Sequence, residues 1–402
     1  MMKNPVDHKP LIIVGGGLAG SLAALALSRR QPDRPLLLLE AGSTFGGNHT
    51  WSFFDSDIPP GGEEWVRALQ PRVWPRYQVA FPGHARRLEQ RYNAIASPRL
   101  DALVRDRLPG HQWRCNCPVA RIEPERVIVA SGEELAACAV IDSRGPDGPM
   151  PGLELGWQKF VGIEFAAQAS GPARMSDRAR ISDTDCPTIM DARVPQIDGY
   201  RFVYTLPLAL DRVLVEDTYY SNTAVLDVEQ VSARVRAAAL EQGIVGPEIR
   251  QESGVLPICI GGDPDVFWPA DDRVARLGIK GGFFHSTTGY SFALALRTAL
   301  DLAQCDDFSA PALAAWSRRR FMAHWQQSAY YRLLNSMIFH AAAPHERYRI
   351  FERFYRLSEP LIARFYSGDL TMLDKARILT GRPPVPIGAA LRSLRYSATG
   401  LR

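Results

Sequence analysis

The sequence has few residues of the kinds that form disulfides or bind metals. Its 402 residues include six cysteines and eight histidines. Only one residue separates Cys115 from Cys117, and neither a zinc site nor a thioredoxin-like pair has that spacing. No histidine occurs in an H-E-x-x-H pattern or a similar pairing. We therefore expect reduced structural thiols and no metal site. The cysteines are Cys115, Cys117, Cys138, Cys186, Cys259 and Cys305.

Long apolar runs are also missing. No window approaches the roughly eighteen apolar residues of a membrane-spanning helix. The first ten residues, MMKNPVDHKP, are polar, so we expect no signal peptide. The composition is that of a globular protein with enough apolar residues for a core. At 402 residues the chain is long for one domain, which predicts two interleaved lobes.

The net charge of +4 is unevenly distributed. From residue 311 onward there are fifteen Lys or Arg against five Asp or Glu, so the remainder is net acidic. Arginines interleave with aromatic residues over 311–380, a pattern that suits helices at a membrane interface. A helix bundle with a solvated basic face is an equally good interpretation. Nucleic acid is disfavoured as a partner, because no RNA-binding motif accompanies the charge.

The stretch around which the chain is organised is LIIVGGGLAG, residues 11–20. It predicts a buried strand, a glycine turn and a helix that begins near Leu18. In the G-x-G-x-x-G pattern, Gly15 permits the tight turn, Gly17 lets the backbone approach a pyrophosphate, and Gly20 lets helix and strand pack closely. An anion would then lie at the positive end of the helix dipole. The cofactor-binding candidates here are Gly15, Gly17, Leu18, Ala19 and Gly20.

A second apolar strand, residues 36–39, ends in Glu40. This glutamate follows Gly20 by twenty residues, where a dinucleotide fold places a ribose-binding acid. Its carboxylate suits the ribose hydroxyls of FAD or NAD and would repel the extra phosphate of NADP. An ordinary glycine turn is the alternative, but strand, helix, strand and acid in this order favour a dinucleotide site.

The chain returns to the parallel sheet about a hundred residues later, with an apolar strand at 138–141. This long excursion argues against a simple NAD dehydrogenase and matches the interrupted plan of FAD proteins. The strand leads into further cofactor-binding candidates, Asp142, Arg144 and Gly145. The loop after the second strand passes over the cofactor in such folds, so His49, Thr50 and Trp51 are candidates to border it. A surface loop with a buried tryptophan is an equally good interpretation.

Residues 156–260 have the pattern of antiparallel strands, which we interpret as the sheet of a second lobe packed over the flavin. A second strand–glycine–helix joint follows at 276–297. There Thr288, Gly289 and Tyr290 are expected to open a helix whose N-terminus points at the flavin ring edge. A plain helix cap is the alternative. The strands are expected at 159–166, 201–207 and 212–218, with a helix over 227–242.

Together these patterns predict an α/β protein. It has an interrupted Rossmann-type FAD-binding fold, a second antiparallel-sheet substrate lobe and a helical C-terminal region. The FAD-binding domain is expected over 10–155 and again over 266–305. The substrate lobe occupies 156–265, and the basic, aromatic-rich helices occupy 306–402.

The motifs resemble the FAD-containing lycopene cyclase family of carotenoid biosynthesis, and within it the bacterial lycopene β-cyclases. Residues 212–218, RVLVEDT, resemble the family's acidic F-L-E-E-T motif, with Asp217 in place of the second glutamate. Residues 285–291 resemble its T-G-Y-S element. The resemblance extends over most of the chain, about 10–380. The other segments that carry it are the glycine turn with Glu40, residues 141–145, Met190 with Asp191, and residues 204–208.

The resemblance implies an enzyme that closes the acyclic ends of lycopene into β-rings, through γ-carotene to β-carotene, without net redox change. The family needs reduced FAD, usually supplied through NADPH, and the NADPH contact is expected to be transient because Glu40 disfavours NADP in the first site. Glu216 is implied as the acid that protonates the terminal double bond. An apolar tunnel is needed to raise its pKa from the usual value of about 4.3. Asp217, also a catalytic candidate, points to the opposite face of a regular strand.

The carbocation formed on the substrate needs negative charge or aromatic faces nearby. Reduced flavin is expected to supply the charge. Phe202, Tyr204, Phe283 and Tyr290 are the expected sources of cation–π contact. A strand end with two solvent-facing acids is the alternative interpretation of Glu216 and Asp217.

Lycopene dissolves in membranes, so the chain is expected in the cytoplasm, peripheral on the inner face of the membrane, where its basic C-terminal region docks. Other interpretations stay open. A flavin monooxygenase or isoprenoid reductase of the same fold would consume NADPH in proportion to product. A prenyl-binding protein resembling GDP-dissociation inhibitors would have no flavin and no activity. The sequence does not decide the ring type from physics, one-ended or two-ended closure, or the oligomeric state.

Overall fold

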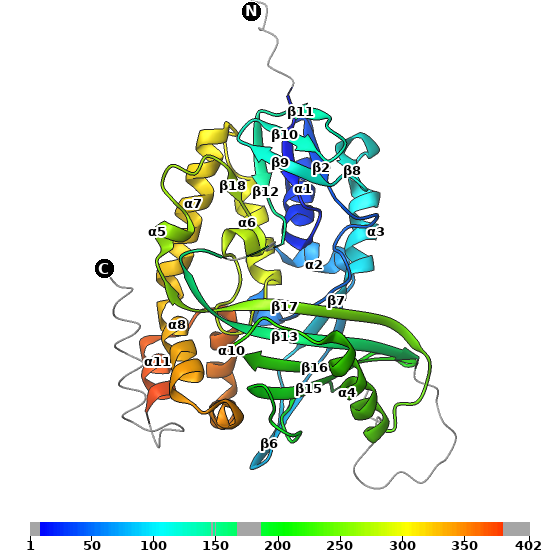
Figure 1. Cartoon of the computed structure of the whole chain (residues 1–402), viewed down its shortest axis with the longest axis vertical. Coiled ribbons are helices and arrows are strands. Elements are labelled where there is room, and N and C mark those ends of the chain that lie inside the picture. The colour runs from blue at the N-terminus through cyan, green and yellow to red at the C-terminus, as the bar shows by residue number, and fades with distance from the viewer. Residues whose placement is uncertain (1–8, 146–147, 149, 167–185, 381–402) are drawn as a thin grey trace, which may run out of the picture.

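A computed structural model describes residues 9–145, 148, 150–166 and 186–380. One end of the molecule is built on a five-stranded parallel sheet (Figure 1). The predicted strands at 11–14, 36–39 and 138–141 pair side by side in it, which confirms the interrupted nucleotide-binding plan. In sheet order the strands are β18 (Ala275–Arg276), β12 (Ala139–Asp142), β1 (Leu11–Val14), β2 (Leu36–Leu39) and β8 (Trp113–Arg114).

Both faces of this sheet are covered, so its strands are apolar throughout. One face packs against the helices α1 (Leu18–Arg30) and α6 (Phe292–Leu302). The alternate residues, among them Ile12 and Leu37, pack against a three-stranded antiparallel sheet. A strand buried on both faces lacks the usual alternation of apolar and polar residues, and β1 and β2 accordingly contain only Leu, Ile and Val. The small sheet consists of β9 (Val119–Glu123), β10 (Arg126–Val129) and β11 (Glu134–Ala136).

The other half of the molecule contains a mixed seven-stranded sheet (Figure 1). The predicted strands at 159–166, 201–207 and 212–218 are its centre and pair antiparallel. The sheet order is β17 (Glu248–Gly262), β13 (Leu153–Ala166), β16 (Arg212–Ser221), β15 (Tyr200–Ala209), β14 (Thr188–Asp191), β5 (Tyr77–Phe81) and β6 (His84–Leu88).

The large sheet is not confined to residues 156–265 as the sequence predicts. The hairpin of β5 and β6 joins it through a parallel pairing of β5 with β14. The expectation of short strands in this stretch is correct, but their partner lies more than a hundred residues away in the chain. Strand pairing of such long range leaves no local pattern in the sequence. A second small sheet, β3 (Thr50–Phe54), β7 (Tyr92–Ala96) and β4 (Arg72–Trp74), lies between the two halves (Figure 1).

The two faces of the large sheet have different partners. One face packs against α4 (Val228–Glu241), the helix predicted at 227–242, through valines such as Val215 and Val235. The opposite face packs, through Tyr200 and Tyr220 among others, against the C-terminal helices. Because side chains alternate along a strand, adjacent residues of β16 belong to different environments.

The predicted C-terminal helices are confirmed. Some of their arginines are buried or paired: Arg347 is fully buried and donates to the Tyr220 carbonyl oxygen, and the half-buried Arg364 pairs with Asp374. The net charge of this region therefore overstates its exposed basic surface. In the part of the chain that the structure describes, no helix has the length and hydropathy of a membrane span. The helices are α7 (Ala310–Gln327), α8 (Ala329–Ser336), a π turn (Met337–Ala341), α9 (Tyr348–Phe354), α10 (Glu359–Ser367) and α11 (Met372–Leu379).

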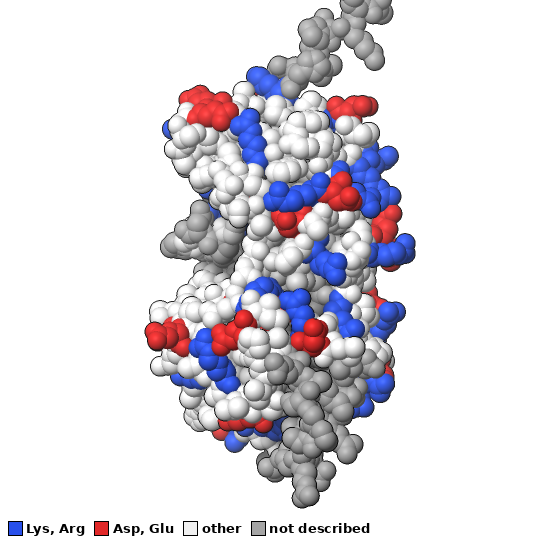
Figure 2. Space-filling view, turned by 90° about the vertical axis from the view of Figure 1, so that its right-hand side faces the viewer, with Lys and Arg blue, Asp and Glu red and all other residues white. Residues whose placement is uncertain are grey.

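Charges of both signs are interspersed on the face seen in Figure 2. This is the side of the molecule on which α3 (Ser97–Arg107) lies (Figure 1). Ion pairs between neighbouring residues, such as Arg105 with Asp101 on α3, account for part of this mixture. Mixed charge of this kind does not favour a polyanion such as nucleic acid.

Candidate functional site

A cavity of about 500 Å³ opens at the carboxyl ends of β1, β2 and β12, and it is called the dinucleotide cavity below because the predicted dinucleotide-binding residues line it. This edge is where open α/β folds bind their ligands, and the volume is typical of a small-molecule site. Most of the cofactor-binding candidates of the N-terminal half line it, together with His49 and Trp51 from the loop after β2. Those candidates are Gly15, Gly17, Leu18, Ala19, Glu40, Arg144 and Gly145.

The three glycines of the turn occupy three different environments. Gly15 has a φ of +101°, and a Cβ there would lie 2.8 Å from the Arg144 nitrogen. A Cβ on Gly20 would lie 2.0 Å from the Gly15 carbonyl oxygen, so Gly20 allows α1 to pack on the strand. A Cβ on Gly17 would meet no atom within 4 Å, because this residue faces the cavity. Gly20 itself supports the turn and does not line the cavity.

Glu40 is held in place by the turn. The backbone N–H of Gly16 donates to its Oε2 at 2.8 Å, and the N–H of Gly42 donates to its Oε1 at 2.7 Å. Each carboxylate oxygen can accept a further hydrogen bond. The side chain lines the cavity beyond the end of β2, so it can accept hydrogen bonds from vicinal hydroxyls of a ligand.

The segment after β12 contributes a cation. Arg144 donates from Nε to Asp142 Oδ1 at 2.9 Å and from Nη2 to Oδ2 at 2.8 Å. Asp142 does not line the cavity but fixes the guanidinium at its edge. Ser143 donates from Oγ to the Gly15 carbonyl oxygen at 2.8 Å, which joins the ends of β12 and β1.

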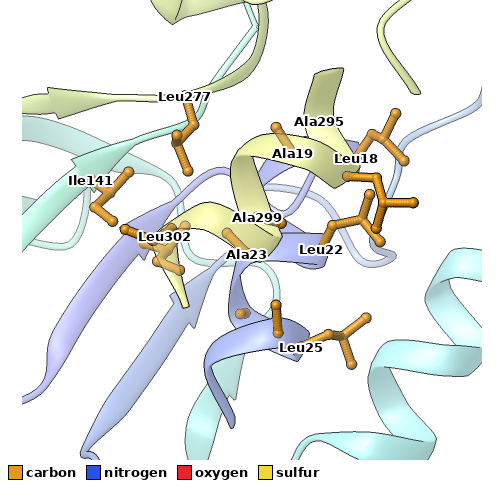
Figure 3. Close-up of a cluster of buried hydrophobic side chains, with 14 of the residues drawn as sticks. Leu18, Ala19, Leu22, Ala23, Leu25, Ile141, Leu277, Ala295, Ala299 and Leu302 are labelled. Atoms are coloured by element: carbon orange, nitrogen blue, oxygen red, sulfur yellow. The ribbon is translucent and has the colours of Figure 1, made fainter. Parts of the chain in front are cut away.

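Helix α6 reaches the same cavity from the C-terminal half. It packs along α1 through small residues, with Ala19 and Ala23 close to Ala295 and Ala299 (Figure 3). Ser291, the residue before α6, lines the cavity, so the positive end of this helix also faces it. Sequence positions almost three hundred residues apart thus form one site.

Thr288, Gly289 and Tyr290 do not open this helix, contrary to the sequence-based expectation. They form a turn, and α6 begins only at Phe292. The N–H groups of Thr287 and Thr288 donate to His285 Nδ1, and Gly289 has a φ of +68°. None of the three candidates lines the dinucleotide cavity; Gly289 and Tyr290 line the adjoining cavity described next.

A second cavity, of about 140 Å³, contains Glu216 and is called the Glu216 cavity below. It adjoins the first, since His49, Trp51, Ile279 and Ser291 line both. Glu216 reaches it from β16, and the remaining walls are mainly aromatic and apolar. They include Tyr92, Phe160, Tyr204, Leu206, Leu214, Leu256 and Tyr290.

The Glu216 carboxyl has a raised pKa. Burial raises its pKa to about 8, and a negative charge on Glu252 adds to that increase. The Thr218 hydroxyl donates to Glu216 Oε1 at 2.6 Å, which opposes the increase. Glu216 and Glu252 are both cross-strand partners of Gly162, so they share a face of the sheet with no side chain between them. At neutral pH Glu216 is therefore mostly a neutral acid.

Asp217 lies on the opposite face, in a different role. Its carboxylate is fully buried, accepts from Arg201 Nε at 2.8 Å and accepts from the Tyr219 hydroxyl at 2.6 Å. It lines neither of the two cavities described here. The geometry agrees with the expectation that only one of the two adjacent acids faces the site.

Three tyrosine hydroxyls meet beside Glu216. The hydroxyl oxygen of Tyr290 is 3.1 Å from the hydroxyl oxygen of Tyr92 and 3.3 Å from that of Tyr204. Of the four aromatic residues expected from the sequence, Tyr204 and Tyr290 face the cavity, whereas Phe202 and Phe283 lie in hydrophobic cores.

Sequence reasoning missed Tyr92, Phe160 and Glu252. Tyr92 comes from β7 and Glu252 from β17, far from Glu216 in the chain. Phe160 could have been found by pairing 159–166 with 212–218, because it lies opposite Thr218 on the face of Glu216. The other two depend on strand order and have no local pattern.

Comparison with known proteins gives matches over nearly the whole chain. A family model described as "Lycopene cyclase protein" matches residues 10–392. A lycopene beta-cyclase of Pseudescherichia vulneris is 41% identical over 386 residues, covering 96% of this chain and 97% of that protein. One of Pantoea ananas is 41% identical over 392 residues, covering 96% and 98%.

Solved structures with the same fold are more distant in sequence. PqsL of Pseudomonas aeruginosa, described as a probable FAD-dependent monooxygenase, has a TM-score of 0.56 at 17% identity, covering 86% of this chain and 99% of that one. A geranylgeranyl bacteriochlorophyll reductase-like protein of Thermoplasma acidophilum has a TM-score of 0.54 at 12% identity, covering 97% and 96%. At these identities the likeness establishes the fold, that of FAD-dependent monooxygenases and reductases.

Proposed function

Because this chain belongs to the lycopene cyclase family, we propose that it is a lycopene β-cyclase. It converts lycopene through γ-carotene to β-carotene. For each ring, a proton adds to the terminal C1=C2 bond, the C5=C6 bond attacks the resulting cation at C1, and C6 loses a proton. One proton enters and one leaves, so the carotenoid is neither oxidised nor reduced.

The observation that carries the mechanism is the carboxyl of Glu216, which is half-buried in an aromatic cavity and mostly neutral at pH 7. We assign it the first proton transfer. An alkene is a very weak base, so the acid must be protonated and sheltered from water when the substrate binds. A pKa of about 8 satisfies the first condition at neutral pH, and the apolar walls satisfy the second.

The cation at C1 is stabilised by aromatic faces. Tyr204, Tyr290 and Phe160 line the cavity that contains Glu216, and cation–π contacts with such rings are worth about 2 kcal/mol when desolvated. Asp217 has a positioning role in this scheme. By pairing with Arg201 it fixes β16, and thereby the direction in which Glu216 points.

The dinucleotide cavity fits FAD. The open side of Gly17 accommodates a pyrophosphate, Glu40 would bind ribose hydroxyls, and Arg144 adds positive charge at the edge. When bound and reduced, the flavin would supply negative charge, and because this cavity adjoins the Glu216 cavity, that charge would favour a developing cation there. NADPH is proposed as a transient reductant, because the fixed carboxylate of Glu40 would repel the 2′-phosphate of NADP in this site.

The substrate partitions into membranes, and we propose that the chain docks on the inner face of the cytoplasmic membrane through α11. Met372 and Leu373 at the start of this helix are 77% and 83% exposed. Lys375 and Arg377 follow on the same helix, and its one acid, Asp374, is paired with Arg364. Exposed apolar residues flanked by cations suit an anionic lipid surface.

The function is tested under anaerobic conditions with lycopene in liposomes and dithionite-reduced FAD, without NADPH. We expect β-carotene by chromatography, no product with oxidised FAD, and loss of at least about a hundredfold in rate for Glu216→Gln. Glu248→Gln, which changes an exposed glutamate on β17, is the matched control. Hydrogenated or oxygenated products would instead identify a reductase or monooxygenase.

A further inference from the structure

The Glu216 cavity has room for only one end of the substrate. Its volume of about 140 Å³ is below the range of pockets that enclose a whole small molecule. A carotenoid is a long apolar chain, so the half that is not reacting needs a second apolar environment. The inference below rests on the proposed function, because it concerns the same substrate.

A further cavity of about 100 Å³, called the distal cavity here, lies between the C-terminal helices and the large sheet. Residues of α8, the π turn, α9, α10 and α11 form one side, and β14 and β16 contribute to the other. Among the described residues that line it, Arg353 is the one with a charged side chain. The apolar and aromatic walls include Met190, Tyr220, Leu334, Met337, Phe351 and Phe354.

Strand β16 contributes a lining residue to each of the two cavities. Glu216 and Tyr220 are four residues apart, so their side chains point to the same face of the strand. Glu216 lines its own cavity, whereas Tyr220 lines the distal one. The two positions are about 13 Å apart along the strand. An extended chain that follows β16 from Glu216 therefore arrives at the distal cavity.

Only a thin wall separates the two cavities. Thr288 lines the distal cavity, and the next residue, Gly289, lines the Glu216 cavity. Tyr366 and Tyr290 belong to the distal cavity and the Glu216 cavity, respectively, and their ring centroids are 6.1 Å apart. The turn around Gly289 and these two rings thus form the boundary along which a polyene would pass.

The distal cavity also meets the molecular surface at α11. Ile378 and Leu379 line it, and Leu379 is 43% exposed. The same helix begins with the exposed Met372 and Leu373. Apolar residues therefore lead from the helix proposed to contact the bilayer to the distal cavity, which the turn around Gly289 separates from the Glu216 cavity.

We infer that the distal cavity binds part of the half of the carotenoid that is not reacting. During the first ring closure this half is acyclic. During the second closure it carries the ring already formed, which is bulkier than the acyclic end. The fit of the distal cavity would then decide whether the reaction proceeds from γ-carotene to β-carotene.

The test narrows the distal cavity at Met337, which is half-buried and lines it. The full-length chain and Met337→Trp are assayed with reduced FAD on lycopene and on γ-carotene, each in liposomes. We expect the ratio of the γ-carotene rate to the lycopene rate to fall about tenfold or more, as for an oversized group in a hydrophobic pocket. Lycopene reactions should then accumulate γ-carotene.

Leu333→Trp is the matched control, because Leu333 is half-buried on α8 but does not line the cavity. Its rate ratio should equal that of the unmodified chain. Met337→Phe replaces Met337→Trp if the latter does not retain flavin. An unchanged ratio in the cavity variant, at any overall rate, overturns the inference. Absence of any cyclised product from the unmodified chain would instead refute the proposed function.

Discussion

At the scale of single residues, Glu216 links catalysis and stability. Its pKa of about 8 in the folded state is above the unfolded value of about 4.3. The folded protein therefore retains a proton that the unfolded chain loses, and stability falls as pH rises between these values. A charged Glu216 is costly to bury, and the neutral acid is the form that the proposed mechanism uses.

We predict that cyclisation is fastest below pH 8 and declines as pH rises through 8, because Glu216 ionises. Glu216→Gln should remove most of the activity, and with it the decline in rate above pH 8. The stability of the variant relative to the unmodified chain should also rise by about 3 kcal/mol between pH 5 and pH 7.5, because the variant has no proton to lose. Chemical denaturation at pH 5 and 7.5 measures this, and an equal stability difference at both pH values would contradict the assignment.

Glu252 is the acid expected to tune the pKa of Glu216. Burial raises the pKa of Glu252 itself, and its ion pair with Arg250 opposes that increase. The other groups that face Glu216 are neutral near pH 8: burial raises the pKa of Tyr92, Tyr204 and Tyr290 above 10 and lowers that of His49. Asp217 on the opposite face pairs with Arg201 and raises the pKa of Glu216 less than Glu252 does.

Removing the negative charge in Glu252→Gln should therefore shift the alkaline limb of the rate profile to lower pH. Glu164→Gln is the control, since Glu164 is also buried and contacts the same Arg250. The rate of cyclisation is measured from pH 5 to 10 for both variants. A shift of equal size in both would show that Arg250, not Glu252, controls the pKa of Glu216.

At the scale of elements, the turn between β1 and α1 contains one glycine that folding needs and another that cofactor binding needs. Gly20→Ala places a Cβ 2.0 Å from a backbone oxygen and should lower the melting temperature or abolish expression. Gly17→Val projects into the open cavity, so the variant should fold while its flavin content falls at least tenfold. Thermal unfolding and flavin absorbance distinguish these outcomes. A normal flavin content in Gly17→Val would show that the pyrophosphate does not bind at Gly17.

Helix α11 gives a second prediction at this scale. Leu373→Glu should reduce sedimentation with anionic vesicles several-fold, because it replaces an apolar contact by a charge of the same sign as the lipid. Activity on detergent-dispersed lycopene should be unchanged. Leu240→Glu on α4 is the control, as Leu240 is also exposed, at 69%. Equal vesicle binding by the two variants would exclude α11 as the docking element.

At the scale of the whole molecule, the fold is shared with redox enzymes but the reaction is not a redox reaction. NADPH should therefore be consumed in amounts that match the flavin and not the product. Anaerobic turnover with NADPH, followed at 340 nm and by chromatography, should yield many β-carotene molecules per NADPH oxidised. One NADPH per ring would favour the reductase alternative.

Much of the nucleotide-binding half could be predicted because its determinants are local. A buried strand, a glycine turn, a helix and Glu40 follow one another within thirty residues. The same holds for the alternation in β16 that points Glu216 and Asp217 to opposite faces. The start of α6 was misplaced because the contacts of His285 with Thr287 and Thr288 keep a turn where the composition suggested helix.

By itself, then, the sequence determined the presence of the dinucleotide motif and the interrupted plan, and its family resemblance suggested Glu216 as the acid. Only the tertiary structure decided what surrounds that acid. Gly162 and Glu252 adjoin Glu216 because β13 and β17 pair next to β16, and Tyr92 arrives from a different sheet. The pKa of a carboxyl depends on burial and on the charges around it. Burial and surrounding charge arise when segments distant in the sequence pack together, so no local sequence pattern encodes them.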